Sequence, residues 1–109
     1  MAFPSAPDDT ATAEAERFGH AQRLMQLRRW TDARSTLHQL AVHNPREPRY
    51  RALLALARGH EASDAGDDRL ARTEWLRAAR LDPTLDGAHA ALRRRRPRTT
   101  LLGRLFGRR

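Results

Sequence analysis

Apolar side chains recur along most of the chain at three- and four-residue intervals, which is the spacing of one face of an α-helix. The pattern predicts a first helix over about 9–27. Its apolar positions are Phe18, Ala21, Leu24, Met25 and Leu27. Acidic residues gather at its start, where they complement the helix dipole. A short break at Arg28-Arg29 separates this segment from a second helix.

The second predicted helix begins near Thr31, whose hydroxyl group is a candidate N-cap. Its apolar positions are Ala33, Leu37, Leu40 and Ala41. The segment HNPREP ends it, because Asn44 tolerates a left-handed conformation and prolines interrupt helical hydrogen bonding. A third helix is expected over about 48–63, with Tyr50 near its start. Its apolar face carries Leu53, Leu54, Leu56 and Ala57, and either Gly59 or Ala57 is its candidate small residue.

A fourth helix is predicted over about 68–80, after the turn SDAGDD, in which Asp67 and Asp68 are candidate N-caps. Its predicted buried residues are Leu70, Ala71, Trp75, Ala78 and Ala79, and its predicted exposed residues are Arg69, Arg72, Arg77 and Arg80. A fifth helix is expected to start with Asp82 as N-cap and Pro83 at the first helical position, and to run to residue 95 or 96, before Pro97. Leu85, Ala88, His89 and Leu92 make it a candidate closing cap.

The chain is therefore predicted to be all-α, with about five helices. The 109 residues allow one small domain. We expect a flexible leader over 1–8, the helical domain over 9–96 and a basic tail over 97–109.

The second and fourth predicted helices share a pattern and end in the same way. The segments RRWTDARSTLHQLAVHNP and AGDDRLARTEWLRAARLDP align on the prolines that follow them. The aligned pairs are Ala33 and Ala71, Leu37 and Trp75, Leu40 and Ala78, and Pro45 and Pro83. Small residues suit the close crossing of two helices, whereas large ones fill the space against a neighbouring hairpin. Trp30 is also expected at a hairpin packing position.

This small–large–small spacing followed by Asn/Asp-Pro resembles the tetratricopeptide repeat. The resemblance covers about residues 13–96 and is more specific in the second hairpin than in the first. The prolines lie 38 residues apart, where the family repeats about every 34 residues. The resemblance implies a right-handed solenoid of antiparallel helical hairpins. Because about three or more repeats are usually needed for a stable stack, self-association is one way to cover the remaining apolar face.

The resemblance also implies a concave groove that binds a partner protein or peptide. The groove candidates are Phe18, Gln22, Met25, Leu53 and Leu56. Some members of the family hold a C-terminal carboxylate with a Lys/Asn clamp. This chain has no Lys, and its single Asn is expected in a turn, so that ligand class is excluded.

The charged residues are distributed unevenly along the chain. The sequence holds 21 basic and 13 acidic residues, and the last 17 residues carry eight Arg and no acid, which leaves 13 of each over 1–92. The tail would also place Leu101, Leu102, Leu105 and Phe106 on one helical face. Candidate residues for an anionic surface are Arg93, Arg94, Arg95, Arg96, Arg98, Leu101, Leu102, Arg104, Leu105, Phe106, Arg108 and Arg109. The alternatives for this tail are an anionic membrane surface, nucleic acid, docking onto its own groove or a second copy, or a solvated end.

No pattern of catalytic or metal-ligating residues stands out. The absence of cysteine excludes disulfides and thiolate metal sites. The segment HEASD has Asp64 where a zincin helix needs a second His, so His60 is expected to be a packed helix residue and His89 a cap contact. We expect a non-enzymatic adaptor without a cofactor.

The N-terminal segment has neither a basic start nor an apolar run, so no signal peptide is expected. No apolar stretch approaches the roughly 20 residues of a membrane span. These patterns favour the cytoplasm, or the inner face of a membrane if the tail binds lipid.

Overall fold

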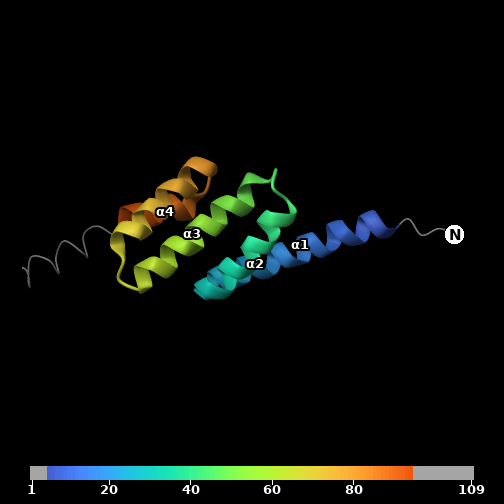
Figure 1. The fold of residues 1–109 in the computed structure, drawn as a ribbon, viewed down its shortest axis with the longest axis horizontal. Helices are drawn as coiled ribbons and strands as arrows, with labels where there is room; N and C mark the ends of the chain where they lie inside the picture. The colour runs from blue at the N-terminus through green and yellow to red at the C-terminus, as the bar shows by residue number, and fades with distance from the viewer. Residues whose placement is uncertain (1–4, 95–109) are drawn as a thin grey trace, which may run out of the picture.

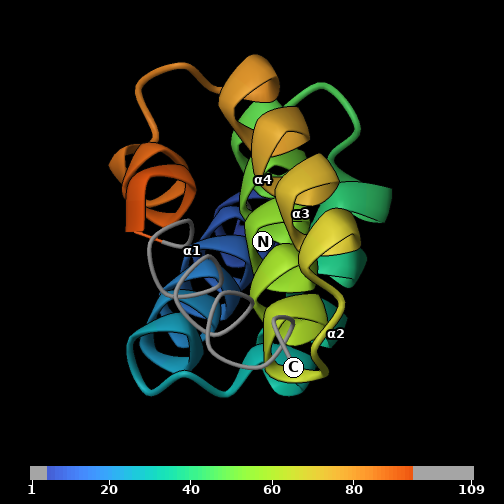
Figure 2. The ribbon, with the colours of Figure 1, turned by 90° about the vertical axis from the view of Figure 1, so that its left-hand side faces the viewer.

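The computed structural model describes the backbone of residues 5–94 and the side chains of residues 10–94. Four helices, α1 (Ser5–Gln26), α2 (Trp30–His43), α3 (Pro48–Asp64) and α4 (Asp68–Leu81), are followed by helical residues 86–94. They succeed one another from α1 at the right of Figure 1 to α4 at the left. Each labelled helix packs on the next, and Figure 2 shows α3 and α4 running side by side. Within residues 5–94, the prediction of an all-α fold with about five helices is confirmed.

The first helix starts at Ser5, earlier than the predicted residue 9. Pro7 lies in its first turn, where a proline is tolerated because the first N–H groups have no partner within the helix. The helix therefore includes residues 5–8 of the segment predicted as a leader. At the other end, Leu27 follows the last helical turn and is 67% exposed, so it does not extend the apolar stripe.

Two predicted helix starts are wrong. In both cases the side chain predicted as the N-cap forms a different hydrogen bond. The N-cap of α2 is Arg29, which makes no side-chain capping bond, whereas the Thr31 hydroxyl donates to Oε2 of Glu61 at 2.7 Å. Asp82 ends α4, and its carboxylate accepts from the backbone N–H and hydroxyl of Thr84 at 3.1 and 2.6 Å. That bonding forms a turn, so helical residues resume only at 86.

The other boundaries follow ordinary capping chemistry. Of the two candidate caps of α4, Asp67 is the N-cap and accepts from the N–H of Leu70 at 3.1 Å, whereas Asp68 is the first helical residue. Glu47 caps α3, with Pro48 in its first turn. Asn44 ends α2 without the predicted left-handed conformation, since its φ is −134°. Its side-chain amide instead donates to the carbonyl of Leu40 at 2.9 Å.

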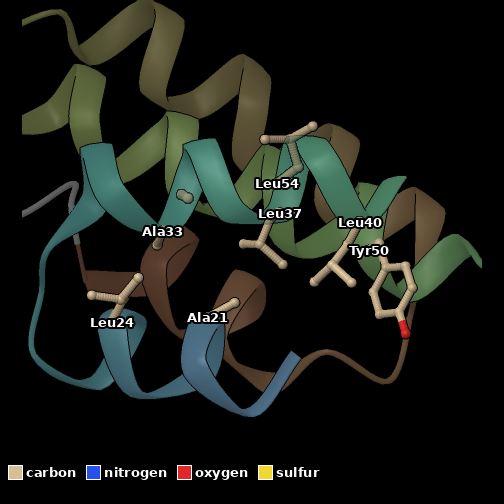
Figure 3. Close-up of a cluster of buried hydrophobic side chains, with 8 residues drawn as sticks. Ala21, Leu24, Ala33, Leu37, Leu40, Tyr50 and Leu54 are labelled. Carbon is tan, nitrogen blue, oxygen red and sulfur yellow. The ribbon is translucent and has the colours of Figure 1, made fainter. Parts of the chain in front are cut away.

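The buried side chains form two clusters, which we call the first and second core. The first core joins α1, α2 and α3, and Figure 3 shows Leu37 and Leu40 of α2 pointing toward Ala21 and Leu24 of α1. It consists of Ala21, Leu24, Ala33, Leu37, Leu40, Tyr50, Leu54 and Ala57. The second core joins α3, α4 and residues 86–94. It consists of Ala55, Leu56, Ala62, Ala71, Trp75, Ala78, Ala88 and Ala91. Met25 and Leu53 pack against both cores.

The predicted faces of α2 and α4 match these cores except at Leu70, and Ala41 and Ala79 pack against them only partly buried. All the residues of the small–large–small pattern are buried, and the four arginines of α4 are exposed. Leu70 was expected to be buried but is 46% exposed. It lies in the first turn of α4, off the face formed by Ala71, Trp75 and Ala78.

At Gly59, α3 lies directly against Trp75 and the backbone of α4. A Cβ atom at this position would overlap Cδ1 and Nε1 of Trp75 and lie 3.1 Å from the carbonyl oxygen of Ala71. Ala57, the other candidate small residue of this helix, belongs to the first core. The absence of a side chain at Gly59 therefore sets the distance at which Trp75 packs.

Replacing Gly59 with Ala is expected to destabilise the protein. Alanine is about 1 kcal/mol better than glycine inside a helix, but overpacking typically costs about 1–3 kcal/mol, and here the obstacle includes a backbone carbonyl. The difference of the two terms is a fall of up to about 2 kcal/mol in the free energy of unfolding, measured by urea denaturation. The matched control is Gly19→Ala in α1, where a Cβ would meet only the Arg23 side chain at 3.7 Å. The control should be neutral or stabilising, and equal gains for both variants would contradict this account.

Candidate functional site

The five groove candidates lie on α1 and α3, which contact each other through the first core. Gln22 is exposed, and Phe18, Met25 and Leu53 are half-buried. Leu56 is only 5% exposed. Its Cδ2 lies 3.1 Å from the position that a Cβ would occupy on Gly87, so residues 86–94 cover it. The structure thus leaves four of the five candidates at the surface and assigns Leu56 to the second core.

A cationic and aromatic group borders this surface. The Phe18 and Tyr50 rings lie 5.2 Å apart, and the guanidinium carbon of Arg49 stands 5.1 Å from the Phe18 centroid. The Tyr50 hydroxyl donates to Oε2 of Glu14 at 2.5 Å. Burial, together with that bond to Glu14, raises the pKa of Tyr50 to about 12. The hydroxyl therefore stays protonated near neutral pH and acts as a donor that ties α3 to α1.

Arg49 and Glu14 were not among the sequence-based candidates. Glu14 lies 36 residues before Tyr50, and no local spacing relates the two. Arg49 directly precedes Tyr50, but its position over Phe18 depends on how α1 meets α3. The half-buried apolar side chains, with Gln22 and Arg49 beside them, form what we call the α1/α3 surface.

A second group of aromatic side chains lies where α2, α3 and α4 meet. His60 stacks on Trp30, with centroids 4.2 Å apart and planes 17° apart, and meets Trp75 at 5.3 Å and 61°. Burial, together with the positive charges of Arg28 and Arg94, lowers the pKa of His60 from 6.5 to about 4 against the opposing charge of Asp64. The ring is thus neutral at pH 7 and acts as a packing group, as expected from the sequence.

This arrangement predicts a loss of stability in mild acid. An unfolded His has a pKa of about 6.5, and the folded value is about 4, so the unfolded chain binds more protons between these pH values. The contribution of His60 to the free energy of unfolding is complete above pH 6.5 and falls as the pH drops toward 4. Each pKa unit corresponds to about 1.4 kcal/mol, and solvent screening of this partly exposed ring reduces the total to about 1–2 kcal/mol.

Urea denaturation at pH 7, 6 and 5 measures this effect. The His60→Gln variant should lose less stability between pH 7 and 5 than the parent chain. The control is His38→Gln, which replaces an exposed histidine of α2 and should keep the parent pH dependence. Identical pH profiles for His60→Gln and the parent would contradict the assignment.

A hollow of about 330 Å³ lies near the turn between α1 and α2, and its walls include the charged side chains of Arg29, Asp32 and Glu61. Arg29 pairs with Asp32 at 2.9 Å. Glu61 accepts from Nε of Arg34 at 2.8 Å and from Thr31. These bonds join the start of α2 to the end of α3. Within residues 10–94, no three His, Asp or Glu side chains are grouped as metal ligands would be.

The packing residues predicted from the repeat are mostly core residues rather than contacts for a ligand. Ala33, Leu37, Leu40, Ala71, Trp75 and Ala78 are buried. Trp30 is half-buried, and Pro45 and Pro83 lie exposed in turns. These residues position α1 and α3 and do not themselves form the α1/α3 surface.

Only the start of the basic segment can be placed. Arg93 and Arg94 are exposed at the end of the described helical residues. The other candidates, Arg95, Arg96, Arg98, Leu101, Leu102, Arg104, Leu105, Phe106, Arg108 and Arg109, lie outside the described residues. No described helix combines the length and apolar character needed to span a bilayer.

The sequence matches no family model, and comparison with curated proteins and with solved structures found no match. The α1/α3 surface is therefore interpreted from its own geometry and chemistry.

Proposed function

We propose that this chain is a non-enzymatic cytoplasmic adaptor of the tetratricopeptide type, in which a right-handed solenoid of two helical hairpins binds a partner protein or peptide. The main support is the set of half-buried apolar side chains Phe18, Met25 and Leu53 on neighbouring helices. A partner that covered them would gain about 25 cal/mol for each Å² of apolar area removed from water.

The polar neighbours of this surface favour a peptide over a purely apolar ligand. The Gln22 amide offers both hydrogen-bond donors and an acceptor. Arg49 is exposed beside Phe18 and pairs with Glu47 at 3.2 Å. Peptide backbone and side chains supply partners for these groups, while apolar anchors fill the space beside Met25 and Leu53.

Site-specific photocrosslinking tests this proposal. Peptides would be selected from a random display library on the full chain, and a photoreactive residue placed at Gln22 should crosslink to them. The matched control places the same residue at His38, which is exposed on α2 and lies outside the α1/α3 surface. Equal crosslinking at both positions, or failure to select any peptide, would count against the proposal.

A second candidate function belongs to the tail. The sequence places four large apolar residues among arginines, which suits a surface that is both anionic and apolar, such as a lipid headgroup layer. Flotation with anionic liposomes tests it. Binding that survives Leu105→Ala together with Phe106→Ala would argue against insertion, and a steep salt dependence with duplex DNA would favour nucleic acid instead.

A further inference from the structure

The outer face of α4 carries a cluster of positive charge. Arg69, Arg72, Arg77 and Arg80 are all exposed, whereas Ala71, Trp75 and Ala78 are buried on the opposite side of the helix. The acidic residues of this helix do not balance the outer face. Glu74 is only 8% exposed, and together with Asp68 it gives the helix two acidic residues against four arginines. Residues 1–92 are neutral overall. The positive charge on this face is therefore a local excess, and the rest of the surface is not uniformly basic.

Most of these arginines are not engaged in ion pairs. Arg77 lies 3.7 Å from Oε1 of Glu74. Within the described residues, Arg69, Arg72 and Arg80 form no ion pair. Three guanidinium groups are therefore available to an anionic partner, and each can bind a carboxylate through two parallel hydrogen bonds.

An exposed leucine lies at the centre of the same face. Leu76 is 36% exposed, and Arg72 and Arg80 lie four residues before and after it, so both are its neighbours on the helix surface. Leu70, which is 46% exposed, adds apolar area near the start of the helix. An apolar centre with a charged rim is the usual composition of a protein–protein contact, in which Arg is enriched.

We propose that the outer face of α4 binds an acidic amphipathic helix of a partner protein. Carboxylates spaced by about two helical turns would pair with Arg72 and Arg80, and an apolar stripe between them would cover Leu76. Phosphate groups would satisfy the arginines equally well but offer nothing to Leu76, so nucleic acid fits this face less completely. The face is formed by a different helix from those of the α1/α3 surface, and the proposal does not depend on that surface.

The test uses the full chain and a synthetic helical peptide with leucines along one stripe and glutamates on both sides. A second peptide of the same charge has serine in place of each leucine. Fluorescence anisotropy at physiological salt should show binding of the leucine peptide and weaker binding of the serine peptide. Amide NMR shifts should map the contact to α4.

Charge reversal separates this face from general attraction to the basic chain. Arg72→Glu with Arg80→Glu should weaken binding by about tenfold or more. Arg17→Glu with Arg51→Glu makes the same change in net charge at exposed positions of α1 and α3 and should leave affinity within about twofold of the parent, since effects of distant rim charges are small. Leu76→Ala, which keeps every charge, should weaken binding by about threefold or more.

Several results would overturn the proposal. Equal losses in the two charge-reversal pairs would show that attraction is general, and equal binding of the serine and leucine peptides would remove the role of Leu76. Tighter binding of a DNA duplex or an anionic vesicle through Arg72 and Arg80 would assign the face to phosphate. Self-association abolished by Leu76→Glu would make a second copy the occupant. None of these outcomes changes the crosslinking expected at Gln22.

Discussion

Trp75→Ala is expected to lower the free energy of unfolding by about 3–5 kcal/mol, as is typical when a buried aromatic side chain is removed. Trp75 is 3% exposed and is by far the largest side chain of the second core, whose other members are alanines apart from Leu56. Small domains are commonly stable by only about 5–15 kcal/mol, so the loss would be a large part of the total. Urea denaturation followed by circular dichroism measures it. Leu76→Ala, one residue further at an exposed position, should cost less than about 1 kcal/mol.

The contact between Trp75 and Gly59 can be tested by combining substitutions at both positions. With the indole present, Gly59→Ala should destabilise, because the new methyl group would overlap the ring. In the Trp75→Ala background the ring obstacle is gone, and the helix preference of Ala over Gly should reduce or reverse the effect by about 1 kcal/mol. A double-mutant cycle measures this coupling. Additive effects would show that Gly59 is not kept small by Trp75.

Leu37→Ala is expected to lower the free energy of unfolding by about 3–5 kcal/mol. Leu37 has no exposed surface and lies at the centre of the first core, between α1 and α3 (Figure 3). The loss combines the transfer of the side chain with the cavity it leaves. Val42→Ala in the same helix is the control, since Val42 is 60% exposed and should change stability by no more than about 0.5 kcal/mol.

The positions of the helices could be predicted from the sequence because the signal is local. Ala33, Leu37 and Leu40 repeat at the period of a helix, and all are buried. Their aligned partners Ala71 and Ala78 are buried too. A helix that packs one face on a core carries apolar residues at this spacing, whichever elements make up the rest of the core. The pattern therefore predicted which faces pack, and erred at Leu70, where the helix has only begun.

Helix ends were less predictable, because several polar side chains compete for each cap. Thr31 is a good capping residue by type, yet Glu61 from a different helix accepts its hydroxyl. Asp82 precedes a proline, as an N-cap often does, but its carboxylate bonds Thr84 and closes a turn. In both cases a bond formed in the fold replaced the one that sequence spacing suggested.

The candidate site depended even more on tertiary contacts. Gln22 and Phe18 lie on α1 as expected, but Leu56 is covered by residues 86–94, and nothing in the spacing of α3 indicates which helix will lie over it. The position of Arg49 over Phe18 and the place of His60 between Trp30 and Trp75 also join different helices. Such contacts depend on how the helices pack on one another, and no periodic pattern in the sequence predicts them.

The sharing of α3 between the two cores has a consequence for how the molecule opens. This helix gives Tyr50, Leu54 and Ala57 to one cluster and Ala55, Leu56 and Ala62 to the other. Each labelled helix packs on the next along the chain, and local opening exposes the least connected part of a fold first. Fraying from either end therefore leaves α3 with one intact neighbour. Its amide protons should be the last to exchange with deuterated water, after those of α1 and α4.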